Sequence, residues 1–131
     1  MIVVDTNVVA YLFLPGVFAT RAERWVREDR DWAAPMLWRS ELRNVLAGFL
    51  RRKQLTFEAA REIQREAEAL LVGSEHEVDS QRVLELVRDS NCSAYDCEFV
   101  SVAMRLGVKL LTADKKVLLA FPAHTLPFST P

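Results

Sequence analysis

Two aspartates lie just after apolar runs that are typical of buried strands. Asp5 follows "IVV" at residues 2–4, and Asp114 follows "VKLLT" at 108–112 with one residue between. Ligand sites in open parallel sheets form outside the carboxyl ends of the strands, where both carboxylates are expected to lie. Each aspartate could equally cap the helix that follows it by accepting backbone N–H groups, so neither alone indicates chemistry.

A third acid lies at the start of a helix. Asp96 precedes Phe99, Val100 and Ala103 by three, four and seven positions, so it shares their inward face. With Ser93 as the N-cap, Asp96 could instead be the acid of a capping box, which is a purely structural role.

A fourth acid lies on the flank of an apolar helix stripe. Glu41, in "MLWRSELRNVLAGFL", lies on the face of Leu37, Val45 and Gly48. An unpaired carboxylate in such a place is costly, so it needs a cation, a donor or water. A salt bridge to an arginine is the simplest alternative to a functional role.

Together the four acids predict a cation site. A compact parallel fold could bring them to one edge of the sheet, where they would repel each other unless protonated or bound to a cation. Oxygen-only ligands suit Mg²⁺ or Mn²⁺, and hydrolysis of a phosphodiester is the chemistry such a site supports best. The candidate catalytic and metal-binding residues are Asp5, Glu41, Asp96 and Asp114.

The elements that position these acids alternate between strands and helices. Such alternation predicts a mainly parallel sheet with helices on both faces, a three-layer α/β/α sandwich formed as a single domain over residues 1–131. Strands are predicted at 2–4, 32–35, 75–79, 108–112 and 123–126. Helices with predicted bounds span about 18–29, 36–53, 57–72, 80–90, 93–106 and 115–121.

Composition narrows the class of protein. A chain of 131 residues, half of them apolar, is long enough for one domain with a real core. A net charge of -1 gives no overall electrostatic case for or against a nucleic-acid partner. Cys92 and Cys97 lack the spacing of a zinc site, and no signal peptide or membrane span is expected. The cytoplasm, with reduced thiols, is therefore the expected location.

Four stretches carry the acids together with their polar neighbours: "VVDTNVV", "SELRNVL", "SAYDCEFVSVA" and "GVKLLTADKKV". In this order, over nearly the whole chain, they resemble the PIN-domain ribonucleases, most closely the VapC-type toxins of toxin-antitoxin pairs. The resemblance implies a PIN-like α/β/α fold, cleavage of RNA that depends on Mg²⁺ or Mn²⁺, frequent homodimerisation, and inhibition by a cognate antitoxin protein. It places the family's metal-binding acids on Asp5, Glu41, Asp96 and Asp114.

Polar residues beside the acids are candidates for a supporting role. Thr6, Asn7 and Thr112 could hold the carboxylates or the waters of a metal, although turn and cap chemistry would also explain them. Glu98 is not included among the candidate metal-binding acids, because a residue two positions after Asp96 points to a different side of the helix.

Cations near the acids are candidates for contact with RNA phosphates. Each could equally be an ordinary solvated charge. They are Arg39, Arg43 and Lys115, with Lys116 and the basic run at 51–53 as further candidates.

A homodimer would need an apolar surface. Five aromatic residues could supply it, although each could instead be buried in the core. They are Trp25, Trp32, Trp38, Phe49 and Phe57.

Two other functions remain open. A phosphatase or phosphoryl-acceptor domain could use Asp5 as its nucleophile, but the sequence has D-T-N rather than D-x-D and lacks a suitably placed lysine after a late strand. A catalytically silent RNA-binding module on a PIN-like scaffold is the second, and the presence of all four acids argues against it.

Overall fold

The computed structural model describes residues 1–129, and its centre is a five-stranded sheet in which every neighbouring pair of strands is parallel. The order across the sheet is β3-β2-β1-β4-β5. Buried β-branched and aliphatic side chains on both faces of β1 explain why the strand lies in the middle. The strands are β1 (Ile2–Val4), β2 (Trp32–Pro35), β3 (Glu75–His76), β4 (Leu110–Thr112) and β5 (Thr125–Pro127).

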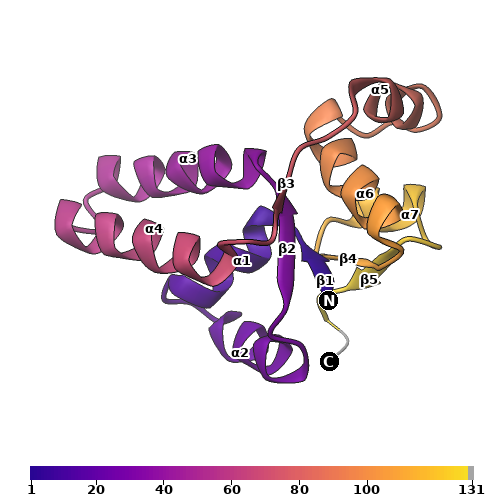
Figure 1. Cartoon of the computed structure of the whole chain (residues 1–131). Coiled ribbons are helices and arrows are strands. Elements are labelled where there is room, and N and C mark those ends of the chain that lie inside the picture. Colours follow the sequence, from indigo (N-terminus) through magenta and orange to yellow (C-terminus); the bar gives the residue numbers. More distant parts are fainter. Residues whose placement is uncertain (130–131) are drawn as a thin grey trace.

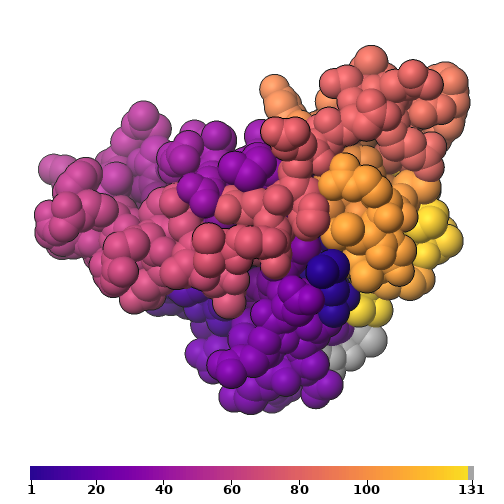
Figure 2. All heavy atoms as spheres, viewed as in Figure 1, coloured from indigo at the N-terminus to yellow at the C-terminus, as the bar shows by residue number. Residues whose placement is uncertain are grey.

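Helices cover both faces of the sheet, which confirms the predicted three-layer α/β/α fold (Figure 1). One layer holds α1 to α4, and the other holds α5 to α7 with α6 against β1, β2 and β4. In the space-filling view of Figure 2 the atoms of α3 and α4 lie on one side and those of α5 and α6 on the other, and the segment around β3 joins them. The helices are α1 (Thr6–Phe13), α2 (Ala19–Glu28), α3 (Leu37–Arg51), α4 (Phe57–Leu71), α5 (Ser80–Arg88), α6 (Ala94–Leu106) and α7 (Lys115–Ala120).

The predicted element bounds hold closely at the caps. Thr56 caps α4 by accepting a hydrogen bond from the Ala59 N–H, and Gly107 ends α6 with a left-handed φ of 68°. The predicted strand at 75–79 is shorter, because it pairs only with the end of β2 and Asp79 already caps α5. The strand expected at 123–126 lies at Thr125–Pro127 instead.

The core decides the fate of the aromatic residues considered for a dimer surface. Trp25, Trp32 and Trp38 are buried, so the structure shows for them the alternative considered from the sequence, burial in the core, and they do not supply an exposed surface. Phe49 is half-buried against the core, and only Phe57 is well exposed, at 65%. Large apolar rings contribute most to stability when they are removed from water, and the three tryptophans lie in the core.

Within residues 1–129, none of the helices combines the length and the apolar character that crossing a bilayer requires.

Candidate active site

The site lies where the order of strands reverses. The chain runs from β1 outward to β3, then returns to β4 on the other side of β1 and continues to β5. The carboxyl ends of the adjacent strands β1 and β4 therefore face the crevice in which open α/β sheets bind ligands. Asp5 follows β1 directly, and Asp114 follows the end of β4 after one residue.

One cavity of about 380 Å³ at this edge is lined by all four predicted acids, Asp5, Glu41, Asp96 and Asp114. The structure thus brings together side chains from the end of β1, from α3, from α6 and from the start of α7. The other lining residues are Thr6, Asn7, Leu37, Ser40, Asn44, Val45 and Tyr95.

A buried hydroxyl connects the two strand-end aspartates. Thr112 is fully buried, and its Oγ1 donates to Asp5 Oδ2 at 2.8 Å while accepting from the Asp114 N–H at 3.0 Å. Asp5 is also the N-cap residue of α1, where the nearby backbone N–H groups of Asn7 and Thr6 lower the pKa of its carboxyl without a capping hydrogen bond of good geometry. Thr112 itself does not line the cavity but orients a carboxylate that does.

Glu41 is held by a hydroxyl rather than by a cation. Thr6 Oγ1 donates to Glu41 Oε1 at 2.7 Å across 35 positions of sequence. The described residues give Glu41 no salt bridge, so the arginine partner considered from the sequence is not found. Asn7 lines the cavity and is exposed.

Asp96 and Asp114 have structural roles as well as places in the cavity. Ser93 Oγ accepts from the Asp96 N–H at 3.1 Å, which is one half of the expected capping box. Asp114 caps α7 through Oδ1, which accepts from the N–H groups of Lys116 at 2.9 Å and Val117 at 3.4 Å. Because both capping bonds go to Oδ1, the other oxygen of Asp114 remains available to a ligand.

Burial and mutual repulsion raise the pKa of Asp5, Glu41 and Asp96. Burial raises the pKa of Asp5, and the charge of Asp96 raises it further, against the opposing hydrogen bond from Thr112. Burial also raises the pKa of Glu41, with added repulsion from Asp5, Asp96 and Glu98, while Thr6 opposes the change. These directions identify a set of like charges held together at some cost, a common property of functional sites.

The pKa of Asp96 is raised in the same way. Burial is the largest cause, Asp114 adds repulsion, and hydrogen bonding by Ser93 and the charge of Lys116 act in the opposite direction. The four acids are thus linked in a continuous electrostatic chain. Glu98 does not line the cavity, but it lies near enough to affect Glu41.

The oxygen donors of the site fit a hard divalent cation, although the side chains are not arranged in a complete coordination shell. Among residues 1–129, no group of three or more His, Cys, Asp or Glu side chains is arranged to hold a metal ion as it stands. The donors are nevertheless all oxygens, they share one cavity, and the described part of the chain gives none of them a salt-bridge partner. Because Mg²⁺ keeps several waters, carboxylates of this kind can bind it partly through water or after side-chain rotation.

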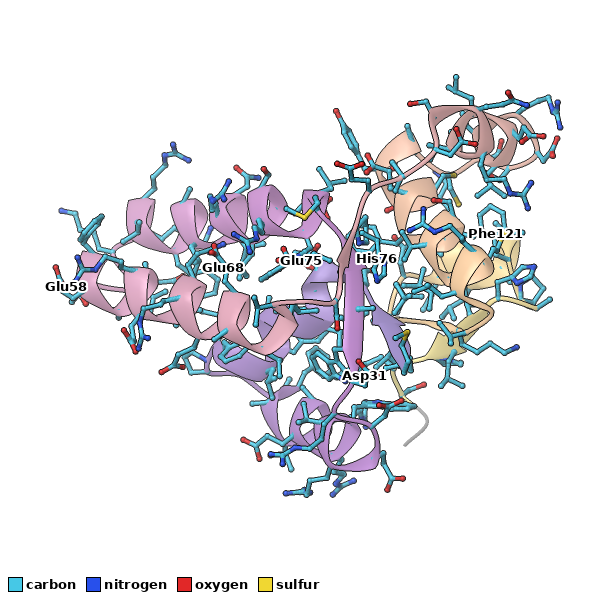
Figure 3. All side chains as sticks on the ribbon, in the orientation of Figure 1. Asp31, Glu58, Glu68, Glu75, His76 and Phe121 are labelled. Carbon is cyan, nitrogen blue, oxygen red and sulfur yellow. The ribbon has the colours of Figure 1, made fainter. Side chains whose placement is uncertain are left out.

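The candidate RNA-binding cations differ in their surroundings. Arg39 is engaged by two carboxylates, with its Nε 2.6 Å from Glu75 and its Nη1 3.0 Å from Glu68. Figure 3 shows both glutamates in the space between α3 and α4. Arg43 is exposed on α3, Lys115 is exposed at the start of α7, and neither lines the cavity.

Sequence reasoning missed three lining residues. Ser40 and Asn44 flank Glu41 on one side of α3, and the spacing of Asn44 three positions after Glu41 is a signal that could have found it. The third is Tyr95, which directly precedes Asp96 in the sequence.

The family model for the PIN domain matches residues 2–121. The chain belongs to the PIN domain family. It is 31% identical over 130 residues to ribonuclease VapC3 from Pyrobaculum aerophilum, an alignment that covers 96% of this chain and 98% of that relative.

Solved structures share the fold of this PIN domain. The crystal structure of FitAcB from Neisseria gonorrhoeae matches with a TM-score of 0.79 and 16% identity, covering 100% of both chains. A toxin-antitoxin complex from Klebsiella pneumoniae matches with a TM-score of 0.72 and 16% identity, covering 96% of each chain. At these identities the likeness supports the fold.

Proposed function

We propose that this PIN domain is a divalent-metal-dependent endoribonuclease and the toxin of a toxin-antitoxin pair. The observation that carries the proposal is the convergence of Asp5, Glu41, Asp96 and Asp114 on one cavity, where the residues described, 1–129, give none of them a salt bridge. The ribonuclease relative, which aligns with nearly the whole chain, supports RNA as the substrate class.

In this proposal the four carboxylates hold Mg²⁺ or Mn²⁺. A bound ion of this kind would supply activation of water and stabilisation of the leaving oxygen of the phosphodiester. The protein's own contribution is orientation. Thr112 orients the Asp5 carboxylate, and Thr6 orients that of Glu41. Ser93 holds the backbone N–H of Asp96, and the Lys116 N–H holds the side chain of Asp114. Asn7 could hold waters of the ion from its place in the cavity lining.

The RNA is proposed to contact Arg43 and Lys115 through its phosphates, since both cations are exposed on elements that carry a site carboxylate. Arg39 was predicted to do the same. Contact by Arg39 would require RNA to displace its ion pairs with Glu75 and Glu68.

The proposed partners follow from the family. A cognate antitoxin protein is supported by the toxin-antitoxin complex among the similar structures, and a homodimer is proposed on the family resemblance. A cytoplasmic location belongs to the same proposal, because cellular RNA is found there. No membrane partner is proposed.

The two alternative functions are less favoured. Covalent phosphorylation of Asp5 would place a further anion at a carboxyl whose pKa burial and the charge of Asp96 already raise. A silent RNA-binding module would have no use for four acids that repel both one another and RNA. Detection of a stable phosphoryl group on Asp5 would favour the first alternative.

The test is cleavage of a single-stranded RNA by a nuclease-free preparation with Mg²⁺ or Mn²⁺ and with excess EDTA. Cleavage should stop on chelation, and Asp5→Asn and Asp114→Asn should each lower the rate strongly at unchanged fold. Glu41→Gln should have a milder effect if Glu41 binds the ion through water. Glu66→Gln, an exposed acid on α4 outside the cavity, is the matched control and should cleave normally. Undiminished cleavage in EDTA would rule the mechanism out.

A further inference from the structure

Tyr95 is an exposed aromatic residue at the wall of the carboxylate cavity. Its side chain lines the cavity together with the four acids, yet the residue is 61% exposed. Among residues 1–129 the ring forms no aromatic pair and the hydroxyl no hydrogen bond. An exposed ring without a structural partner contributes little to the stability of the fold.

The backbone beneath the ring is firmly held. Tyr95 lies in the first turn of α6, where Ser93 accepts from the Asp96 N–H at 3.1 Å through its side chain and from the Cys97 N–H at 3.0 Å through its carbonyl. The ring therefore projects from a fixed position beside a site carboxylate. A tyrosine has only two rotatable side-chain bonds, so ordering it on a ligand costs little entropy.

The cavity itself gives RNA little electrostatic help. Among residues 1–129 its lining contains four acids and no lysine or arginine, so the protein's own field at the site repels phosphates wherever a bound cation does not offset it. Single-stranded RNA is commonly bound by stacking of unpaired bases on aromatic rings, an interaction that does not depend on charge. Among the cavity-lining residues, Tyr95 is the aromatic one and can supply it.

We propose that Tyr95 is the platform on which a nucleobase next to the scissile phosphodiester stacks. The proposal rests on the proposed ribonuclease function and adds the residue that positions the substrate. It assigns Tyr95 to binding of the RNA, with no role in holding the metal.

The experiment compares wild type with Tyr95→Ala and Tyr95→Phe on a short single-stranded RNA. Tyr95→Ala should raise KM by about 5- to 150-fold, the range expected for loss of one base-stacking aromatic, with a much smaller change in kcat. Tyr95→Phe keeps the ring and should restore KM. Leu84→Ala is the control, because Leu84 is a similarly exposed large apolar side chain, 63% accessible, on α5 and outside the cavity.

Substrate variants identify the stacked base. An abasic site at the stacked position should raise KM for wild type and add nothing further for Tyr95→Ala, since both changes remove the same interaction. Equal KM values for wild type and Tyr95→Ala would overturn the proposal. An additive effect at every abasic position would overturn it as well.

Equilibrium binding separates this inference from the function on which it rests. RNA carrying 2-aminopurine, in buffer with Ca²⁺, should show fluorescence quenching by wild type and by Tyr95→Phe but not by Tyr95→Ala. If wild type binds and quenches but never cleaves, the ribonuclease function fails and the stacking role stands. If wild type neither binds nor cleaves RNA, both are overturned.

Discussion

The hydroxyl of Thr112 offers the sharpest perturbation of the site, because it touches two of the four acids without entering the cavity. Thr112→Val keeps the shape and the β-branched character of this fully buried residue and removes only the hydroxyl. A hydrogen bond to a charged group is worth about 1.5–3 kcal/mol, and the Asp114 N–H would lose an acceptor worth about 1 kcal/mol. We therefore expect a loss of roughly 2–4 kcal/mol in the free energy of unfolding at neutral pH.

The loss should depend on pH in a direction set by Asp5. Burial raises the pKa of Asp5 above its ordinary 3.8, so the folded state favours the protonated acid and the unfolding free energy falls as pH rises from 3.8 through the raised value. The Thr112 hydroxyl lowers the pKa of Asp5, so its removal raises that pKa further and enlarges the fall. The difference between variant and wild type should thus be small near pH 3.8, where the folded protein holds Asp5 mainly protonated, and largest near pH 8.

Urea denaturation in EDTA at both pH values measures this difference. Thr125→Val is the matched control: Thr125 is also a buried strand threonine, but its hydroxyl donates to the Phe121 carbonyl at 2.9 Å, away from any acid. The control should lose about 1 kcal/mol at either pH. If Thr112→Val showed the same small, pH-independent loss, the account of how Asp5 is held would be refuted. Thr112→Val should also lower metal affinity or cleavage about 10- to 100-fold.

Three further outcomes follow from the same structure. Asp96→Asn should leave the protein in EDTA as stable as wild type or more stable, because burial and the charge of Asp114 disfavour its carboxylate. The same variant should abolish cleavage and the metal-induced thermal shift. An equal loss of stability with and without metal, together with intact cleavage, would reduce Asp96 to a capping residue. Arg39→Gln should lower the melting temperature, because Glu75 loses its ion-pair partner. Arg43→Gln should instead chiefly raise the Kd for RNA, measured by fluorescence anisotropy. The reverse pattern would contradict the structural role of Arg39 and the RNA-binding role of Arg43. Sedimentation at tens of micromolar should show a dimer, and a protein that stays monomeric there would contradict the proposed assembly.

Local sequence was enough to predict the strands and helices that carry the acids. The run at residues 2–4 is apolar on both faces and ends at an acid, so it identifies a central parallel strand and a site position together. Thr56 and Gly107 predict helix ends because each acts on the adjacent backbone: Thr56 accepts a backbone N–H, and Gly107 adopts a left-handed φ. The helix after Asp5 was expected, but its bounds at Thr6–Phe13 were not predicted.

Contacts between distant residues could not be predicted in the same way. The bond from Thr112 to Asp5 spans 107 positions and depends on the register in which Leu111 of β4 lies beside Val4 of β1. The sequence does not reveal the ion pair of Arg39, because its partner Glu75 lies 36 positions away on the edge strand β3. The burial of Trp38 likewise follows from packing, which a helical pattern leaves open.

The central claim is that the four carboxylates act together as one divalent-cation site, and metal binding followed by melting temperature tests it most directly. Saturating Mg²⁺ or Mn²⁺, at about 100 times its Kd, should stabilise wild type by about 2.7 kcal/mol. Asp5→Asn should lose this gain, and Glu66→Gln, an acid outside the cavity, should keep it. A gain of the same size in Asp5→Asn and wild type, or no gain in a wild-type protein that still cleaves RNA, would contradict the account.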